Sequence, residues 1–595
     1  MSRLQPPSLA RYLLAGVLLL VACRPAAGLP APDVGGPPAA FTPPPTPPIF
    51  GPGQPDAAAL SPAQAGQPAT PTLNPGLPSA TPWPSPRPPT AAPSRTPSPR
   101  PGVGVGLAAG AGVPAELRQA LIDFAAGQPD MYGWEAAEAP RQVRLTAGRG
   151  QPLANWLYVV AAPFATLQDA MSLDEVRAGW AQGANGAGRL VLDEESAAAF
   201  GALWGPAAAS AWIVSPAELP SALWAARPAW TLYPFERLQP DLKVLSVDGA
   251  SPLAADFRPE AWPLWLPVGL EGDPGAVARL EAAWPGPAAN YDPAGLTRVA
   301  MTGVTALGRA TAYQMEVQGI TAPGVAVAPA MQAADIAHVS HEVAFAPDCP
   351  YPNPIGDPIF CARDGYLELL RSLGTDVVEL TGNHVNDWGT ANLAHTIELY
   401  EAAGMRTFGG GRNLEEAGRP ALFEHNGNRI AFVGCNPVGP AYAWATAGSA
   451  GSRPCDYAAF QAQIGELSAQ GYLVIATLQY GEFYHYAPTP QQAADFGALA
   501  SAGAAAVSGS QGHHAQGFAF EDGAFIHYGL GNLFFDQMQM LGTRQSFIDV
   551  YTVYQGRLIH VELVTSLIEN YCCPRTMTAA ERGQLLLSVF SASGW

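Results

Sequence analysis

Three side chains that can form hydrogen bonds or coordinate a metal ion lie within a stretch of five residues. They are Asn383, His384 and Asp387. The residues before them, 376–380, are mostly apolar and predict a short strand, and the spacing of apolar residues over 391–403 predicts a helix. The three side chains therefore belong to a tight turn at the carboxyl end of a strand, where open α/β sheets place their chemistry. The alternative is a turn rich in Asx residues whose role is to cap the next helix.

The elements that position this turn form a predicted α/β unit over residues 297–567. Helical segments separate most of its strands, and a hairpin follows them at 546–554 and 557–564. The remainder, 568–595, predicts one helix at 579–590 and a tail. The expected strands are 299–302, 336–339, 377–380, 430–434, 473–478, 505–507 and 525–528.

A smaller α/β unit is expected over residues 114–290. Residues 156–162 form a buried-strand run, and Ser172 with Glu175 forms a capping box that opens a helix through Trp180. The order of these segments resembles one lobe of a periplasmic solute-binding protein of the phosphate-binding type. The alternative is a structural α/β module without a ligand, and no ligand residue is assigned.

The N-terminus predicts an export signal. Arg3 and Arg11 precede an apolar run at 12–22, which is too short to span a bilayer comfortably. The end of this run together with the next residue, 20–23, resembles a bacterial lipobox. This resemblance implies a signal peptide over 1–23 and lipidation of Cys23. The protein would then be extracytoplasmic and anchored to the cell membrane. The alternative is ordinary cleavage near Ala26. Both readings export the protein.

Residues 24–113 consist largely of Pro, Ala, Thr, Ser and Gly without apolar periodicity. Such a segment cannot bury enough surface to offset its ordering entropy, so it predicts a disordered, partly polyproline spacer. The net charge of the chain is −19 and the pI is about 4.9, which argues against a nucleic-acid partner.

Cysteine positions agree with export. Apart from Cys23, six cysteines remain, and an even number outside the cytoplasm suggests disulfides. Two pairs each flank a loop and are the simplest local bridges, whereas the adjacent Cys572 and Cys573 are left unassigned. The expected bridges are Cys349 with Cys361 and Cys435 with Cys455.

Five loops of the larger unit resemble, in the right order, the CapA family of poly-gamma-glutamate capsule-biosynthesis proteins. That resemblance covers about 270 residues and implies a calcineurin-like metallophosphatase fold. The segments are 303–309, 335–342, 382–389, 479–491, and 509–516 with its sequel 528–534.

In the metallophosphatase pattern, two metal ions clamp the attacking and leaving oxygens, and loop Asp, Asn and His residues bind them. This chain departs from that pattern at several ligand positions. Val304 replaces the bridging aspartate, and Gln479 and Gln511 replace two histidines. Because amides are poorer ligands than imidazoles for transition metals, a standard dinuclear site is not expected.

The same loops carry other His and Glu residues, which can bind a single divalent metal of unknown identity or perform acid–base chemistry. The alternative is that they are polar residues on exposed loops. The candidate catalytic residues are His384, Asp387 and Glu342; the candidate metal ligands are Asn383, His513, Glu342 and His341; and the candidate substrate-binding residues are Arg309, Glu482, His485 and His514.

Two functions follow from this resemblance. The first is an exported hydrolase, with a rebuilt active site, that acts on an anionic polymer such as poly-gamma-glutamate or on a small phosphoester. The second is a membrane-tethered binding or assembly protein that holds such a polymer without cleaving it. The acidic net charge disfavours a polyanion unless local positive charge is present, for which Arg309 and Arg363 are candidates.

Overall fold

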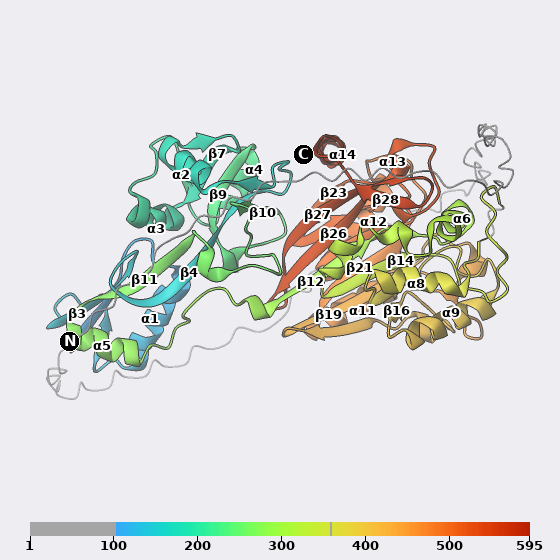
Figure 1. Ribbon diagram of the computed structural model, residues 1–595. Coiled ribbons are helices and arrows are strands. Elements are labelled where there is room, and N and C mark those ends of the chain that lie inside the picture. The colour runs from blue at the N-terminus through green and yellow to red at the C-terminus, as the bar shows by residue number, and fades with distance from the viewer. Residues whose placement is uncertain (1–102, 357–359) are drawn as a thin grey trace, which may run out of the picture. The chain divides into compact units, whose positions relative to one another are not determined.

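The computed structural model describes residues 103–356 and 360–595 (Figure 1). The predicted signal peptide, Cys23 and nearly all of the predicted spacer lie outside the described residues. Among the described residues, no helix combines the length and the apolar character that crossing a membrane requires. Two α/β regions follow one another along the chain, and each is described by itself.

The N-terminal region is built on one mixed sheet with the strand order β2-β1-β3-β11-β4-β9-β7-β6. The long strand β4 pairs with β11 along its first half and with β9 and β10 along its second half. Its strands are β1 (Val105–Ala109), β2 (Tyr132–Trp134), β3 (Arg141–Ala147), β4 (Gln151–Pro163), β5 (Ala170–Met171), β6 (Ala184–Asn185), β7 (Gly188–Asp193), β8 (Trp212–Val214), β9 (Ala229–Pro234), β10 (Leu242–Val247) and β11 (Trp265–Gly272).

Helices of the N-terminal region pack their apolar residues on this sheet, around the buried Trp156, Phe200 and Trp230. The predicted capping box is confirmed, because Ser172 and Glu175 exchange hydrogen bonds at the start of α2. The sheet begins earlier than predicted, with β1 ahead of residue 114. The helices are α1 (Ala115–Gly127), α2 (Leu173–Gln182), α3 (Glu194–Trp204), α4 (Leu219–Ala225) and α5 (Pro274–Ala282).

The C-terminal region contains two larger sheets. The first has the order β16-β15-β14-β12-β26-β27-β28, with the short β13 pairing with β14 and β25. Its central pairs are parallel, and β26 with β27 forms the predicted antiparallel hairpin. Its strands are β12 (Leu296–Thr302), β13 (Val304–Thr305), β14 (Ile336–His341), β15 (Val377–Glu379), β16 (Arg406–Phe408), β25 (Asn532–Phe534), β26 (Gln545–Tyr554), β27 (Arg557–Glu569) and β28 (Cys573–Thr576).

The second sheet has the order β18-β19-β21-β22-β24-β23, and its inner pairs are also parallel. The minor pair β17 (Gly410–Gly411) and β20 (Gly451–Ser452) lies outside both sheets. All seven predicted strands of this region are present. The strands of the second sheet are β18 (Ala421–His425), β19 (Asn428–Cys435), β21 (Leu473–Gln479), β22 (Ala506–Ser510), β23 (Phe518–Glu521) and β24 (Ala524–His527).

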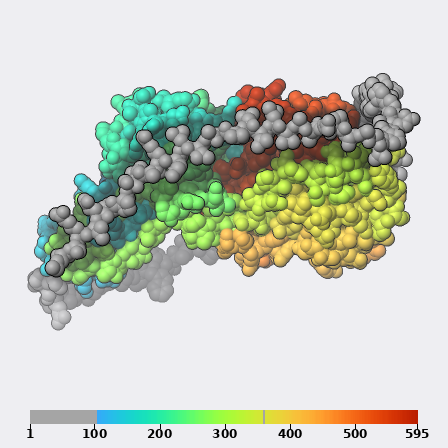
Figure 2. Space-filling model, viewed as in Figure 1, coloured from blue at the N-terminus to red at the C-terminus, as the bar shows by residue number. Residues whose placement is uncertain are grey.

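Apolar residues on the facing sides of the two sheets form one core, in which Met301 and Ile336 share a cluster with Phe432 and Ile475. The outer face of the first sheet packs against α8 and α9, and that of the second against α11 and α12, which gives four layers. Figure 2 shows the exterior of this region in space-filling form. The helices are α6 (Arg309–Gln318), α7 (Ala328–Gln332), α8 (Leu367–Ser372), α9 (Thr390–Ala402), α10 (Leu414–Ala417), α11 (Tyr457–Ala469), α12 (Pro490–Ser501), α13 (Leu541–Arg544) and α14 (Ala579–Ala592).

Candidate functional site

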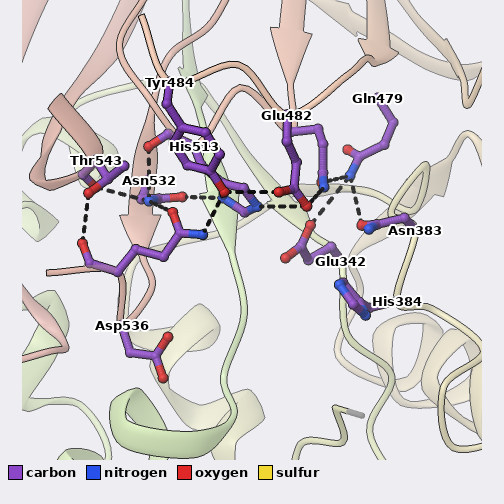
Figure 3. Close-up of polar contacts among 12 residues, drawn as sticks. Glu342, Asn383, His384, Gln479, Glu482, Tyr484, His513, Asn532, Asp536 and Thr543 are labelled. Carbon is purple, nitrogen blue, oxygen red and sulfur yellow. Dashed lines mark hydrogen bonds and ion pairs between the residues drawn. The ribbon is translucent and has the colours of Figure 1, made fainter. Parts of the chain in front are cut away.

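Carboxyl-end loops of both sheets bring a group of polar side chains together (Figure 3). The first sheet supplies residues directly after β14 and β15, and the second supplies residues at the ends of β21 and β22. We call this group the amide cluster. Its members are Glu342, Asn383, His384, Gln479, Glu482, Gln511 and His513.

Gly382 permits the close approach of two of these loops. A Cβ atom at this position would overlap the Cα and Cβ atoms of Glu342. The backbone of His384 also pairs with Val343 in an isolated parallel bridge. Glycine therefore lets the Asn383 turn lie directly against the Glu342 backbone.

Strained backbone also marks the cluster. Gln511 has a φ of 72° and His513 a φ of 37°, and the neighbouring Arg309 has a φ of 43°. Residues with a side chain adopt this left-handed region at a cost, and such strain concentrates at functional sites.

The side-chain amide of Gln479 lies at the centre of the cluster. Its Nε2 donates to Glu342 Oε2 at 3.3 Å and to Asn383 Oδ1 at 3.2 Å, and it also donates to Gln511 Oε1. Gln479 itself is fully buried. Three oxygens from three different loops therefore face the N–H groups of one amide.

Two residues that were not predicted as site residues, Ser510 and Glu379, fix the orientation of this amide on its Oε1 side. The Ser510 hydroxyl lies 2.9 Å from both Gln479 Oε1 and Glu379 Oε1. Glu379 is buried in β15 and also bonds to Thr381 and His338. Burial raises the pKa of Glu379, but the nearby His338 and the hydrogen bond from Thr381 outweigh it and lower the pKa overall. In the sequence, Glu379 is a carboxylate within an otherwise apolar strand, and this feature could have identified it as a residue with buried polar partners.

The donors of the cluster do not fit the dinuclear metal site of the metallophosphatase pattern. Val304 is buried in the apolar core rather than in the cluster. In the described part of the chain, no three His, Cys, Asp or Glu residues come together as a group that could hold a metal ion. Amide N–H groups at the centre of the cluster replace the attraction that a cation would provide for these oxygens.

Glu342 is fully enclosed by the cluster. Its side chain is buried, and its Oε1 accepts no hydrogen bond from any described residue. Burial raises the pKa of Glu342, although the nearby His513 and His384 partly oppose this change.

His384 forms a pair with Asp387 within its own turn, with Nδ1 at 2.7 Å from Asp387 Oδ2. Burial lowers the pKa of His384, but the hydrogen bond to Asp387 and the charge of Glu342 outweigh this, so the pKa lies above its usual value. The exposed Tyr442 donates to the other oxygen of Asp387 at 2.9 Å, and Phe360 packs edge-on against the imidazole.

His513 and Glu482 lie on the opposite side of Glu342 from His384 (Figure 3). The Nδ1 of His513 lies 2.7 Å from Asn532 Oδ1, and its Nε2 lies 4.0 Å from Glu482 Oε1. Glu482 accepts hydrogen bonds from Gln511 at 3.1 Å and from Tyr484 at 2.9 Å.

Three predicted histidines do not join the cluster. His341 points into the core and lies 2.6 Å from the Tyr400 hydroxyl, and burial lowers its pKa to about 3. Successive residues of a strand point to opposite faces, so His341 and Glu342 could not both face the cluster. His514 is buried against Gly542 and Tyr486, and His485 lies on an exposed loop stacked on Phe483.

Arg309 lies beside the cluster without bonding to it. Its guanidinium binds Asp536 in a bidentate ion pair, with one N–O distance of 2.5 Å, and stacks over Phe360 at 4.3 Å. A pocket of about 330 Å³ adjoins this region, and Tyr351, Phe360 and Arg363 are among its lining residues.

Disulfides join Cys349 to Cys361 and Cys435 to Cys455, in the expected local pairs. The structure also joins the adjacent Cys572 and Cys573. The first bridge closes a loop that begins near the Glu342 turn and lines the pocket beside Phe360.

Residues 298–537 match the model of the family described as "Bacterial capsule synthesis protein PGA_cap". This segment contains every member of the amide cluster. The resemblance to the CapA family is confirmed. The α/β fold class expected from that resemblance is confirmed with it.

Curated relatives support the same assignment. The chain is 29% identical over 180 residues to "Capsule biosynthesis protein CapA" of Bacillus anthracis, which is 30% of this chain and 44% of that protein. It is 26% identical over 172 residues to "PGA biosynthesis protein CapA" of Bacillus subtilis (strain 168), which is 29% of this chain and 45% of that protein. The chain thus spans less than half the length of these relatives.

Solved structures show weaker similarity. A putative 5'-nucleotidase from Staphylococcus aureus aligns at 11% identity with a TM-score of 0.30, over 49% of this chain and 58% of its own. An ABC-type phosphate transport receptor from Vibrio cholerae aligns at 11% identity with a TM-score of 0.24, over 30% of this chain and 91% of its own. Similarity at this level assigns no activity to either region, and the solute-binding character of the N-terminal region stays a prediction.

Proposed function

We propose that this chain binds a poly-gamma-glutamate-type polymer during capsule biosynthesis, and that it does so without a metal ion. The family match and the curated relatives support the role in the pathway. The position of Gln479 Nε2 among the oxygens of Glu342, Asn383 and Gln511 supports independence from metal. A cluster whose central position holds an amide N–H group is suited to holding a ligand by hydrogen bonds rather than to activating water on a metal.

A hydrolase is the second candidate, and the pairing of His384 with Asp387 favours it. A histidine whose pKa is raised by a carboxylate can act as a general acid near neutral pH. Such an enzyme would need its own nucleophile or a bound water, and no residue of the cluster is assigned to that role.

Two assays on the purified protein separate these functions. The first titrates poly-gamma-glutamate into the protein, and the second follows turnover of phosphoesters and of the polymer by the wild type and by His384→Ala. Binding without turnover on either substrate class is the expected result. Turnover that falls by about 10²-fold or more in His384→Ala would replace the binding role with the hydrolase.

The proposal includes a lipid anchor at Cys23, which would hold the binding domain at the cell surface. Its support is the sequence of residues 1–23 alone. Mass spectrometry of the protein from its native membrane should find a diacylglyceryl group on Cys23 at the mature N-terminus. An unmodified N-terminus near residue 28 would contradict the anchor.

A further inference from the structure

The hydrogen-bonding capacity of the amide cluster is not fully used within the described chain. Glu342 Oε1 is buried and accepts no hydrogen bond from a described residue, whereas Glu342 Oε2 accepts from Gln479. A buried carboxylate oxygen without a donor costs free energy, so this atom is suited to accept an N–H group from a ligand.

An unused amide donor and an unused imidazole nitrogen lie beside this unused acceptor. Asn383 uses its Oδ1 to accept from Gln479, and its Nδ2 donates to no described residue. His384 uses Nδ1 for Asp387, and its Nε2 has no described partner. Both side chains are partly exposed and lie next to the Glu342 carboxylate (Figure 3).

The charge of the cluster disfavours an anion at this point. The carboxyl groups of Glu342, Glu482 and Asp387 surround it. The nearby Arg309 is paired with Asp536. A phosphoester placed against Glu342 would meet like charge, whereas a neutral group that carries one donor and one acceptor would satisfy the free atoms.

We infer that the amide cluster recognises the secondary amide linkage of the polymer. The linkage N–H donates to Glu342 Oε1, and the linkage carbonyl accepts from Asn383 Nδ2; His384 Nε2 donates to the same carbonyl when the imidazole carries both of its protons. This inference rests on the proposed function, because it names the group of the bound polymer that the cluster contacts.

The surroundings of the cluster suit the rest of such a chain. Tyr442 and Tyr484 are 57% and 42% exposed, and their hydroxyls hold Asp387 and Glu482, so their rings offer apolar surface to methylene groups. Arg363 lines the adjoining pocket and is partly exposed, with its Nη1 bound to Glu316 and its other N–H groups available to a polymer carboxylate.

The inference is tested by calorimetric titration with two matched oligomers of gamma-linked glutamate. One has amide linkages, and the other has ester linkages of the same length and charge. An ester lacks the N–H group, so the wild-type protein should bind it at least tenfold more weakly. A phosphodiester oligomer of equal length should bind more weakly than the amide oligomer.

Substitution of Glu342 provides a second, independent test of the preference for amide over ester linkages. In Glu342→Gln, the side-chain amide can donate to the ester oxygen, so the preference for amide over ester should fall toward unity. Glu424→Gln on the exposed edge strand β18 is the matched control and should keep the wild-type preference.

The outcomes separate this inference from the proposed function. Equal affinity for the amide and ester oligomers would overturn the inference while leaving polymer binding in place, as would tighter binding of the phosphodiester. If neither glutamate oligomer binds, the result contradicts both the proposed function and the inference that rests on it. The ester comparison uses wild-type protein, so a folding defect in Glu342→Gln cannot obscure the result.

Discussion

Gln479 occupies the position where the metallophosphatase pattern has a metal-binding histidine, and its side-chain amide organises the hydrogen bonds of the cluster. Gln479 Nε2 donates to oxygens of Glu342, Asn383 and Gln511, while Ser510 lies against its Oε1. An amide offers both donors and an acceptor, so it links the two sheets without requiring a cation.

Gln479→Leu should therefore destabilise the protein, because it leaves three buried or partly buried oxygens without their donor. The expected loss is about 2–4 kcal/mol in the free energy of unfolding, measured by urea denaturation. Gln491→Leu is the control, because Gln491 is exposed and bonds only to Asp495 among the described residues; its effect should stay within about 0.5 kcal/mol. Equal effects of the two substitutions would show that the central amide contributes nothing particular.

Glu236 provides a pH-dependent contribution in the N-terminal region. Burial raises its pKa from 4.5 to about 7, although hydrogen bonds from Asn290 and Trp156 oppose this. Between these two pH values the folded chain keeps a proton on Glu236 that the unfolded chain has lost, so stability from this group falls as the pH rises.

Glu236→Gln should remove that dependence. The difference in unfolding free energy between variant and wild type should shift in favour of the variant from pH 4.5 to 7, by at most about 1.4 kcal/mol per pH unit. Urea denaturation followed by tryptophan fluorescence at several pH values measures it. A difference that is constant across this range would contradict the raised pKa.

At the scale of elements, the strand ends decide which predicted residues reach the cluster. The apolar runs predicted the strands, and the turn after β15 was placed correctly at a carboxyl end. Alternation along β14 separates His341 from Glu342, and this could have been read from the sequence. The orientation of Gln479 could not, because it depends on Ser510 from β22 and Glu379 from β15, which are far apart in the chain.

The approach of the β15 turn to the β14 end depends on Gly382. Gly382→Ala should force these loops apart, because the new methyl group would overlap the Glu342 backbone. The expected cost is about 1–3 kcal/mol in unfolding free energy, together with weaker polymer binding. Gly365→Ala is the control, because a Cβ there meets no atom within 4 Å. Unchanged stability and binding in Gly382→Ala would show that close contact between the loops is not required.

At the scale of the molecule, the C-terminal region has a two-sheet layout, and Val304, Gln479 and Gln511 occupy positions where the resemblance to the CapA family implies metal-binding groups. The two sheets pack against each other through buried apolar residues such as Met301 and Phe432, which are not members of the amide cluster. The sequence therefore predicted the fold class correctly, whereas the loss of the dinuclear site, inferred from Val304, Gln479 and Gln511, stays a prediction. It did not predict that amides would occupy the centre of the cluster.

The most direct test of this account measures the affinity for poly-gamma-glutamate before and after removal of metal. The full chain is dialysed against EDTA, its metal content is determined by elemental analysis, and the polymer is titrated with and without added Zn²⁺ or Mn²⁺. The account predicts less than one equivalent of transition metal before dialysis and the same polymer affinity in all samples. Stoichiometric metal in the purified protein, together with binding that is lost in EDTA and restored by metal, would contradict it.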